Sequence, residues 1–316
     1  MHQSLFFKLF PPPKFLLMPH VGIDISDDAI SFIEYSRPVG DRTITKHGTV
    51  NLDVGIIEGG DIKDEAKLLE ILSTIVRDNN LLYAKLSIPE EKAYLFETEI
   101  PYGDLKLISQ NIEFKLEENI PLSAADVIFT FDLLPNEHNK PWRASVFAVP
   151  RTYIEHMVEM FRKVGIIPVA FETAPRAIAR VVSGLGQGNV IVIHVLHRKT
   201  GVYVITDNAV GFTSTISIGY SEANIGLYTD SLATEIHRVC SFWLNQNQDE
   251  FSAIHKVVVV GHDAENVVLN LRDKVSDTVS VEVIDVWHSV LDMTKYVPPI
   301  DRDGSFEYAP AAGLAL

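Results

Sequence analysis

Cysteine is almost absent from this sequence. Cys240 is the only one in 316 residues, so the chain can form no internal disulfide. It also has no Cys-x-x-Cys pair of the kind that binds zinc or exchanges electrons. This composition is typical of a protein from a reducing compartment.

Clusters of basic residues are missing as well. The chain has 27 Lys and Arg against 42 Asp and Glu, a formal charge of −15, and no run of five basic residues. Proteins that bind nucleic acids rely largely on clustered Lys and Arg, which neutralise the phosphates. We therefore expect no polynucleotide partner.

Near the N-terminus the apolar run is short. Residues 4–10 are mostly apolar but far fewer than the roughly 20 that a membrane-spanning helix needs, and three prolines follow at 11–13. The segment also lacks the charged start and cleavage site of a secretory signal. We expect a cytoplasmic protein in which residues 1–20 form an arm, either packed on the body or in weak contact with a membrane surface or a partner.

Familiar catalytic and metal-binding patterns are not found. There is no Gly-x-Ser-x-Gly motif, which argues against a hydrolase triad. Of eleven histidines, His194 and His197 are the closest to a zinc pattern. They fall on a predicted strand and turn rather than on one helix face, and no third ligand has a recognisable spacing. We therefore expect no zinc site.

What the chain does have is the composition of a folded core, with 47% hydrophobic residues, and a length that suits two domains. Alternating patterns predict antiparallel strands at 21–25, 29–35 and 43–52. A helix that begins after Asp64 and ends near residue 80 follows, and then a buried strand at 84–88. The first block is thus three strands, a helix and a strand.

The pattern changes near residue 93. Strands are predicted at 94–100, 127–134 and 143–149, with one helix capped by Asp104 and ended by Ile120 and Pro121, and another over 154–161 that ends at Gly165. This block predicts an inserted α+β subdomain over residues 93–166.

The first arrangement then recurs. A strand at 169–171 and a helix from Thr173 to about 182 return to the first domain, and 183–188 is a glycine-rich linker. Three strands, a long helix and a strand follow between residues 190 and 260. This repeat predicts an α/β fold with two similar domains beside a cleft: 21–92 with 167–186, and 187–316, whose C-terminal helix packs back on the first.

The duplicated plan, headed by the segment Gly-Ile-Asp-Ile-Ser at 22–26, resembles the actin-like ATPase superfamily. Three further places narrow the resemblance: Glu-Gly-Gly-Asp-Ile at 58–62, the insert segments 114–117 and 120–121, and the ending 308–315. In this order they are similar to the PilM family of type IV pilus assembly proteins, which is related to the cell-division protein FtsA. The resemblance implies the actin-like ATPase fold, with two duplicated α/β domains flanking a cleft and a small α+β insert in the first.

The resemblance also implies where ATP with Mg²⁺ would lie. In relatives, a tight hairpin from each domain places backbone N–H groups and the metal against the phosphates. Carried over position by position, the cofactor-binding residues are Asp24, which would also organise the metal, Ser26, Thr200, Glu235, Arg238 and Gly261.

Both hairpins depart from the family pattern. Asp27 and Asp28 follow the first strand and would repel a polyphosphate. In the second hairpin, His194 and Leu196 stand where relatives have an acid and a glycine. The adjacent basic residues at 198 and 199 either pair with phosphates or form a solvated turn.

The residues expected to contact the nucleoside match the family pattern only in part. Glu235 and Arg238 match a pair that contacts ribose and base in relatives, and they also fit an ordinary surface ion pair. Gly261 is retained, but His262 and Asp263 would crowd the base.

The resemblance therefore implies a cytoplasmic scaffold at the inner membrane that binds the N-terminal tail of a PilN-like protein and couples it to the pilus machinery. The tail is expected in a groove between the first domain and the insert. Nucleotide binding and self-association stay open, and hydrolysis is expected to be weak or absent. The alternatives are an active actin-like ATPase and an FtsA-like membrane-associated filament protein, although the basic amphipathic helix of the latter is not found after residue 308.

Overall fold

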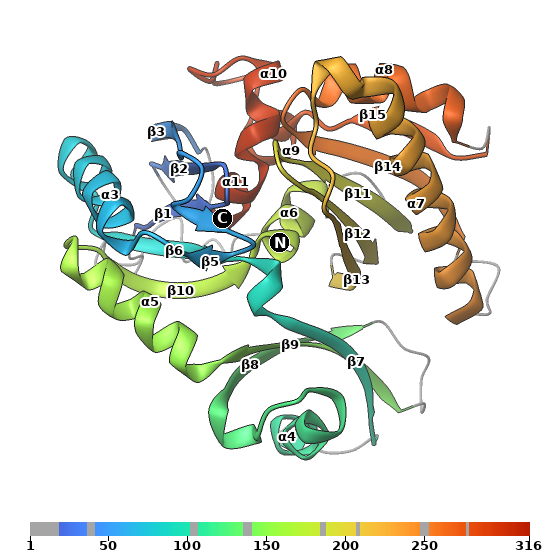
Figure 1. The fold of residues 1–316 in the computed structure, drawn as a ribbon, viewed down its shortest axis with the longest axis horizontal. Coiled ribbons are helices and arrows are strands. Elements are labelled where there is room, and N and C mark those ends of the chain that lie inside the picture. Colours follow the sequence, from blue (N-terminus) through green and yellow to red (C-terminus); the bar gives the residue numbers. More distant parts are fainter. Residues whose placement is uncertain are drawn as a thin grey trace.

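The structure, a computed structural model of the 316-residue chain, describes residues 19–36, 42–101, 107–134, 141–183, 188–206, 209–246, 253–275 and 278–316. Two five-stranded sheets stand beside each other with helices between and outside them, and a three-stranded sheet lies below (Figure 1).

The first sheet comes from the N-terminal half. Its strands are β1 (Val21–Ile25), β2 (Ala29–Tyr35), β3 (Ile44–Asn51), β6 (Tyr83–Ile88) and β10 (Ile167–Thr173), in the order β10-β6-β1-β2-β3. The first three form the predicted antiparallel meander, β6 runs parallel to β1, and β10 runs parallel to β6.

One face of this sheet is covered by α3 (Glu65–Asn79) and α5 (Arg151–Lys163), whose apolar side chains share a core with β1 and β6. The predicted cap of α3 is confirmed, because the Asp64 carboxylate accepts a hydrogen bond from the Lys67 N–H at 2.9 Å. Before α3, the short hairpin of β4 (Ile57–Glu58) and β5 (Asp61–Ile62) turns at Gly59 and Gly60. Their φ angles of +57° and +73° require glycine.

The second sheet repeats the first strand for strand. It contains β11 (Asn189–Val195), β12 (Thr200–Thr206), β13 (Ala209–Ile216), β14 (Ile254–Gly261) and β15 (Ser280–Val283), in the order β13-β12-β11-β14-β15. Its outer face is covered by α7 (Ile225–Gln246) and α8 (Ala264–Leu271). The internal repeat is therefore confirmed.

Between the two sheets lie α6 (Ala174–Val182) and α11 (Ala309–Ala315), which share one hydrophobic core with strands of both sheets. Residues of α9 (Val286–Val290) belong to the same core. The short helix α10 (Arg302–Ser305) follows α9 in the chain. Glycine residues allow α11 to lie close to α6 and to β1. A Cβ atom on Gly313 would lie 1.9 Å from the carbonyl oxygen of Ala177, and one on Gly22 would lie 2.2 Å from that of Ala311. The C-terminal helix thus packs on the first domain.

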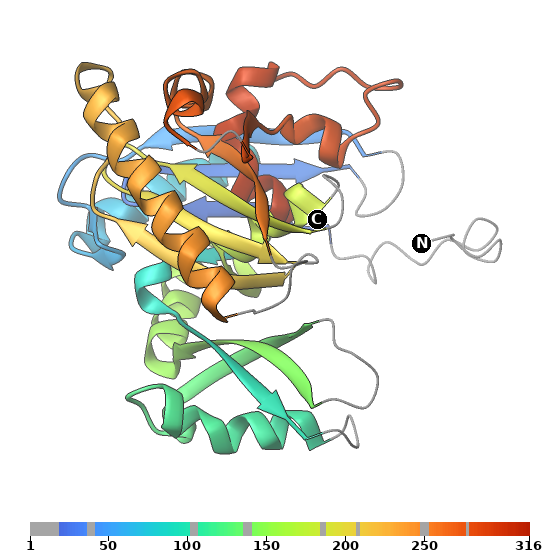
Figure 2. The same cartoon turned by 90° about the vertical axis from the view of Figure 1, so that its right-hand side faces the viewer.

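The insert is a separate small sheet, seen from the side in Figure 2. It consists of β7 (Tyr94–Ile100), β8 (Val127–Leu134) and β9 (Trp142–Pro150), in the order β7-β9-β8, with α4 (Ile108–Asn119) packed on one face. The helix predicted as its last element is α5, but Met157, Met160 and Phe161 of α5 pack in the core of the first domain. An amphipathic pattern does not say which sheet a helix covers. We propose that the insert ends near Pro150 rather than at residue 166.

Three sequence predictions fall partly or wholly outside the described residues: the arm up to residue 18, the cap at Asp104, and the linker at 184–187. Across the ranges that the structure describes, none of the helices has the length and apolar character needed to cross a bilayer.

The close contact of α11 gives the first prediction. Replacing Gly313 by Ala places a methyl group against the backbone of α6, so we expect the free energy of unfolding to fall by about 1–3 kcal/mol or more. Urea unfolding followed by circular dichroism measures this change. Gly226→Ala is the control, because Gly226 is an exposed helical position where a Cβ atom meets nothing within 4 Å. An equal effect of the two changes would contradict the packing described.

Candidate functional site

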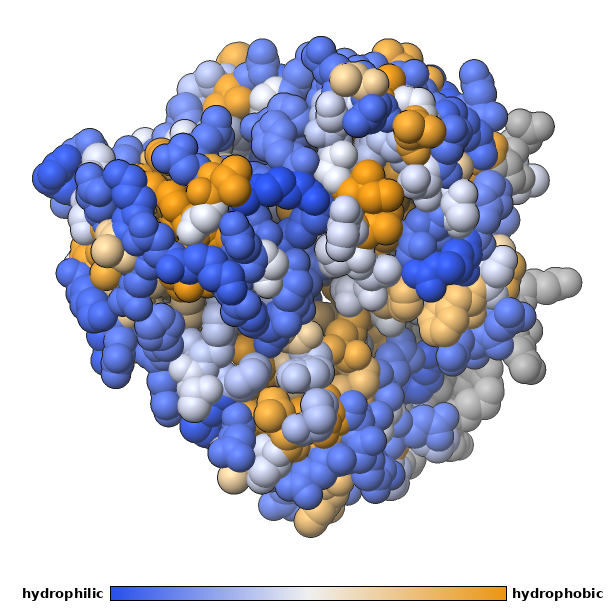
Figure 3. All heavy atoms as spheres, in the orientation of Figure 1, coloured by the Kyte–Doolittle hydropathy of each residue, from blue (hydrophilic) through white to orange (hydrophobic). Residues whose placement is uncertain are grey.

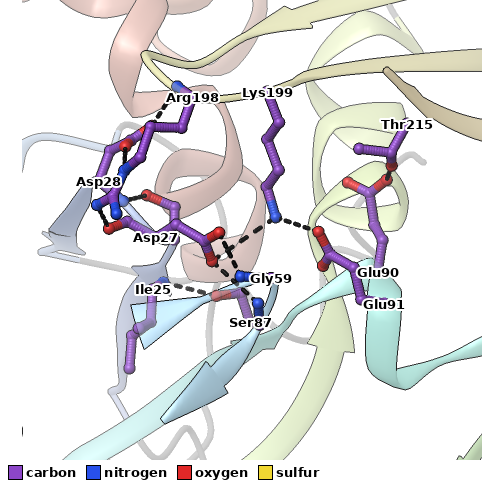
Figure 4. Close-up of polar contacts among 12 residues, drawn as sticks. Ile25, Asp27, Asp28, Gly59, Ser87, Glu90, Glu91, Arg198, Lys199 and Thr215 are labelled. Atoms are coloured by element: carbon purple, nitrogen blue, oxygen red, sulfur yellow. Dashed lines mark hydrogen bonds and ion pairs between the residues drawn. The ribbon is translucent and has the colours of Figure 1, made fainter. Parts of the chain in front are cut away.

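Two hairpin turns face each other in the cleft between the domains. The first turn, 26–28, joins β1 to β2, and the second, 196–199, joins β11 to β12. The fold brings them into contact although Asp28 and His197 are 169 positions apart in the sequence. Figure 4 shows their side chains pointing toward one another across the cleft.

The side chain of Asp28 binds the backbone of the second turn. Its buried carboxylate accepts hydrogen bonds from the backbone N–H groups of His197 at 2.9 Å and Arg198 at 3.3 Å, and from the Arg198 Nε at 2.6 Å. The Arg198 guanidinium also donates to the carbonyl oxygen of Asp27. Two successive backbone N–H groups on one acceptor form the geometry with which such turns bind anions. Here the anion is a side chain of the protein itself.

Asp27 is held from both sides of the cleft. Its carboxylate accepts hydrogen bonds from the N–H groups of Gly59 at 2.8 Å and Gly60 at 3.1 Å. The ammonium group of Lys199 lies 3.8 Å from Asp27 and also pairs with Glu91. We call the contacts of Asp27 and Asp28 with His197, Arg198 and Lys199 the interdomain clasp.

Glu90, just after β6, makes another contact between the domains. One carboxylate oxygen accepts a hydrogen bond from the Tyr203 hydroxyl of β12, and the other accepts one from the Thr215 hydroxyl of β13 at 3.1 Å. Burial raises the pKa of Glu90 to about 7, against the opposite effects of the Tyr203 hydrogen bond and the charge of Lys199.

The predicted cofactor residues are only partly brought together. Asp24, Ser26 and Gly261 line a cavity of about 50 Å³ between the hairpins. The Ser26 hydroxyl is engaged within its own turn, where it accepts hydrogen bonds from the N–H groups of Asp28 and Ala29 at 3.2 and 3.1 Å. It thus shapes the turn that carries Asp28.

Asp24 is buried beside Ser87, and burial raises its pKa to about 6, although the Ser87 hydrogen bond and Lys199 act in the opposite direction. Thr200 is turned away from the cleft. Its hydroxyl donates to the carbonyl oxygen of Ile218 at 2.9 Å and lies 2.8 Å from the Tyr228 hydroxyl. Among the described residues, no group of three or more His, Cys, Asp and Glu is placed to hold a metal ion.

Two predicted residues, Glu235 and Arg238, lie outside this cavity. Glu235 pairs with Arg238 at 2.8 Å and accepts a hydrogen bond from Ser214 at 3.0 Å, and neither member of the pair lines the cavity. Gly261 has φ +97°, and a Cβ atom there would lie 2.2 Å from the carbonyl oxygen of Val195. Glycine is therefore needed for strand packing at this point.

Two histidine rings and a glutamate meet at the wall of this cavity. The ring of His262 lies 3.8 Å from that of His197, centroid to centroid, and its Nδ1 lies 2.9 Å from a carboxylate oxygen of Glu307. The hydrogen bond to Glu307 raises the pKa of His262.

These residues do not fit ATP with Mg²⁺ in this arrangement. The amides of the second turn are bound to Asp28, and the hydroxyls of Ser26 and Thr200 are engaged elsewhere. The cavity of about 50 Å³ is much smaller than the roughly 300 Å³ or more of a typical ligand pocket. A nucleotide would have to displace the clasp.

A protein-family model described as type IV pilus assembly protein PilM matches residues 22–224. The chain belongs to the PilM family. No curated protein sequence matches it significantly.

Solved structures support the fold. The PilM-PilN type IV pilus biogenesis complex contains a chain with 15% identity and a TM-score of 0.79, with 95% of this chain and 98% of that chain covered. The ethanolamine utilization protein EutJ from Carboxydothermus hydrogenoformans is 14% identical, with a TM-score of 0.52 and coverage of 96% and 90%. The cytoplasmic domain of EpsL, an inner-membrane component of the type II secretion system of Vibrio cholerae, is 12% identical, with a TM-score of 0.50 and coverage of 92% and 93%. At these identities the similarity establishes the actin-like fold, a fold that suggests a nucleotide cleft in general.

A second cavity, of about 170 Å³, lies between the insert and the first domain of this PilM-family chain. We call it the insert groove. Its lining is largely apolar and comes from six elements, with Ile88, Ile154 and Arg176 beside residues 128–130, 147, 149 and 171–173. Figure 3 shows apolar surface in the hollow above the insert.

Two features of the insert groove suit an extended chain. It is lined by β8 and β10, which are both outer strands of their sheets, and such strands have backbone groups open to pairing. The Thr173 hydroxyl in its wall is buried and has no hydrogen-bond partner among the described residues. At the end of the groove, Arg176 pairs with Asp132 at 2.8 Å.

Sequence reasoning named the residues of the clasp but not their pairing, and it missed Glu90, Glu91 and Tyr203. One signal was available: two acids follow the first repeat's leading strand, and two bases lie at the corresponding turn of the second repeat. Opposite charges at equivalent turns of a duplicated fold predict a contact across the cleft.

The raised pKa of Glu90 predicts a pH dependence of stability. Because the folded state binds this proton more tightly than the unfolded state, the contribution is present below about pH 4.5 and is lost as pH rises toward about 7. The Glu90→Gln variant should therefore lose less unfolding free energy than the wild type between pH 5 and pH 8, as measured by urea titrations. Glu113→Gln, at an exposed position, should behave like the wild type. A Glu90→Gln curve parallel to that of the wild type would rule out this role.

Proposed function

We propose that this chain is a scaffold of type IV pilus assembly, or of a related secretion system, that binds the cytoplasmic N-terminal tail of a PilN-like inner-membrane protein. The tail would lie in the insert groove. Membership of the PilM family and similarity to the chain of a PilM-PilN complex support the partner. The partner would also place the chain at the inner membrane.

The observation that carries the proposal is the insert groove itself. An extended peptide added to an edge strand gains main-chain hydrogen bonds, and alternate side chains enter apolar pockets. The edge of β8 offers backbone groups for main-chain hydrogen bonds, and the rings of Phe129, Phe147 and Phe171 line an apolar pocket. The Thr173 hydroxyl offers a further hydrogen bond to a peptide group.

We further propose that ATP hydrolysis has no part in this role. The clasp gives the carboxylates of Asp27 and Asp28 donors from the protein, so the two domains are held together without a nucleotide. A scaffold of this kind presents one fixed groove to its partner.

The experiment is calorimetric titration of the full-length chain with a synthetic peptide of the PilN-like tail from the same organism. We expect saturable binding by the wild type and a loss of at least tenfold in Ile128→Glu, because the new carboxylate would enter the apolar groove. Leu133→Glu is the matched control, since Leu133 is an exposed residue of the same strand that does not line the groove.

Absence of heat at high peptide concentration would contradict the proposed partner. Equal losses of affinity in the two variants would contradict binding in the insert groove. The salt dependence of the affinity shows which kind of contact binds the tail. A basic tail should bind less tightly as salt rises, because the chain carries a charge of −15. Binding that does not change with salt would assign the affinity to the apolar wall.

A further inference from the structure

A larger hollow, of about 350 Å³, lies between the insert and the second domain. Along β9, the Ser145 hydroxyl donates to the carbonyl oxygen of Val210 in β13 at 2.7 Å. On one side of this contact, Phe147 faces the insert groove; on the other, Arg143 lines the larger hollow. We call this hollow the second groove. It is outside both the cleft and the proposed tail site.

Aromatic side chains form one wall of the second groove. Phe212 of β13 and Phe242 of α7 lie 5.3 Å apart between ring centroids, and the Phe242 side chain is 43% exposed. Gly211 is left unpaired by an irregularity in the pairing of β13 with β12, and a Cβ atom there would lie 2.5 Å from the ring of Trp243. The missing side chain therefore lets β13 pack closely against the Trp243 ring, which lines the groove although only 5% of it is exposed.

Strand edges border the same space. β13 is the outer strand of the second sheet and β7 is the outer strand of the insert, and both line the second groove. An irregularity in an edge strand is a common feature next to binding sites, because it redirects side chains locally.

Two arginines at or beside the second groove are more exposed than the glutamates with which they pair, although the chain as a whole carries −15. Arg143 pairs with Glu97, and the arginine is the more exposed partner, at 39% against 26%. Arg238 lies one helical turn from Phe242 and pairs with Glu235, at 64% against 11% exposed. In each pair the carboxylate holds the guanidinium in place, and the guanidinium is the more exposed member.

We propose that the second groove is a docking surface for an acidic segment of a partner protein. An apolar side chain of that segment enters between Phe212, Phe242 and Trp243, and a neighbouring carboxylate meets Arg143 or Arg238. Guanidinium groups recognise carboxylates through paired N–H donors. The acidic remainder of the surface repels such a segment, so the site is specific in position. This assignment also gives a role to Glu235 and Arg238, which the nucleotide cleft does not use.

The test uses the full-length ¹⁵N-labelled protein and two blocked tetrapeptides, acetyl-Glu-Phe-Leu-Glu-amide and acetyl-Lys-Phe-Leu-Lys-amide. The chain has three tryptophans, so its indole N–H signals are few, and a Trp243→Phe variant assigns the relevant one. We expect the acidic peptide to shift the Trp243 signal in a saturable way and the basic peptide to leave it unchanged.

Variants locate the site. Phe242→Ala and Arg238→Glu, both at exposed positions, should each weaken binding of the acidic peptide by about fivefold or more. Leu244→Ala, at an exposed position of the same helix outside the groove, and Ile128→Glu, in the insert groove, should leave it unchanged. Equal shifts with both peptides, no shift with the acidic one, or unchanged affinity in Phe242→Ala would overturn the proposal.

Discussion

The carboxylate of Asp28 on the backbone amides of the second hairpin is the contact on which the rest of the cleft depends. A turn with successive N–H groups directed at one point attracts an anion, and related folds use this property to hold phosphates. In this chain Asp28 provides the anion from the opposite domain, and the Arg198 guanidinium closes around it. The same geometry that would bind a ligand therefore binds the two halves of the protein to each other.

The clasp acts together with the packing between the sheets. α6 and α11 bury their apolar residues against both sheets, so the domains share a core as well as a charged contact. The segment after β6 connects cleft and groove directly: Ile88 lines the insert groove, and two residues later Glu90 contacts the second domain. A cleft held shut by protein groups thus keeps the wall of the proposed tail site in a fixed position. This is a physical reason why a fold built around a nucleotide can serve as a scaffold.

Much of this architecture could be predicted from the sequence, because strand alternation and helix spacing are local signals. The duplicated order of strands and helices and the Asp64 cap were both recovered. The end of the insert was harder to predict, because an amphipathic pattern does not say which sheet a helix covers and α5 packs in the core of the first domain. The site was harder for a different reason. Thr200 and Ser26 have the residue types of phosphate ligands, but their hydroxyls are engaged by Ile218 and by the first turn itself. Such partners are set by the tertiary structure, and composition and spacing do not contain them.

If the clasp occupies the place of a nucleotide, calorimetric titration of Mg-ATP should distinguish the wild type from an Asp28→Ser variant. We expect no saturable heat for the wild type at millimolar nucleotide. The variant should show measurable binding, because the amides of His197 and Arg198 lose their acceptor. Saturable binding of Mg-ATP by the wild type that disappears in Asp24→Asn would contradict this expectation.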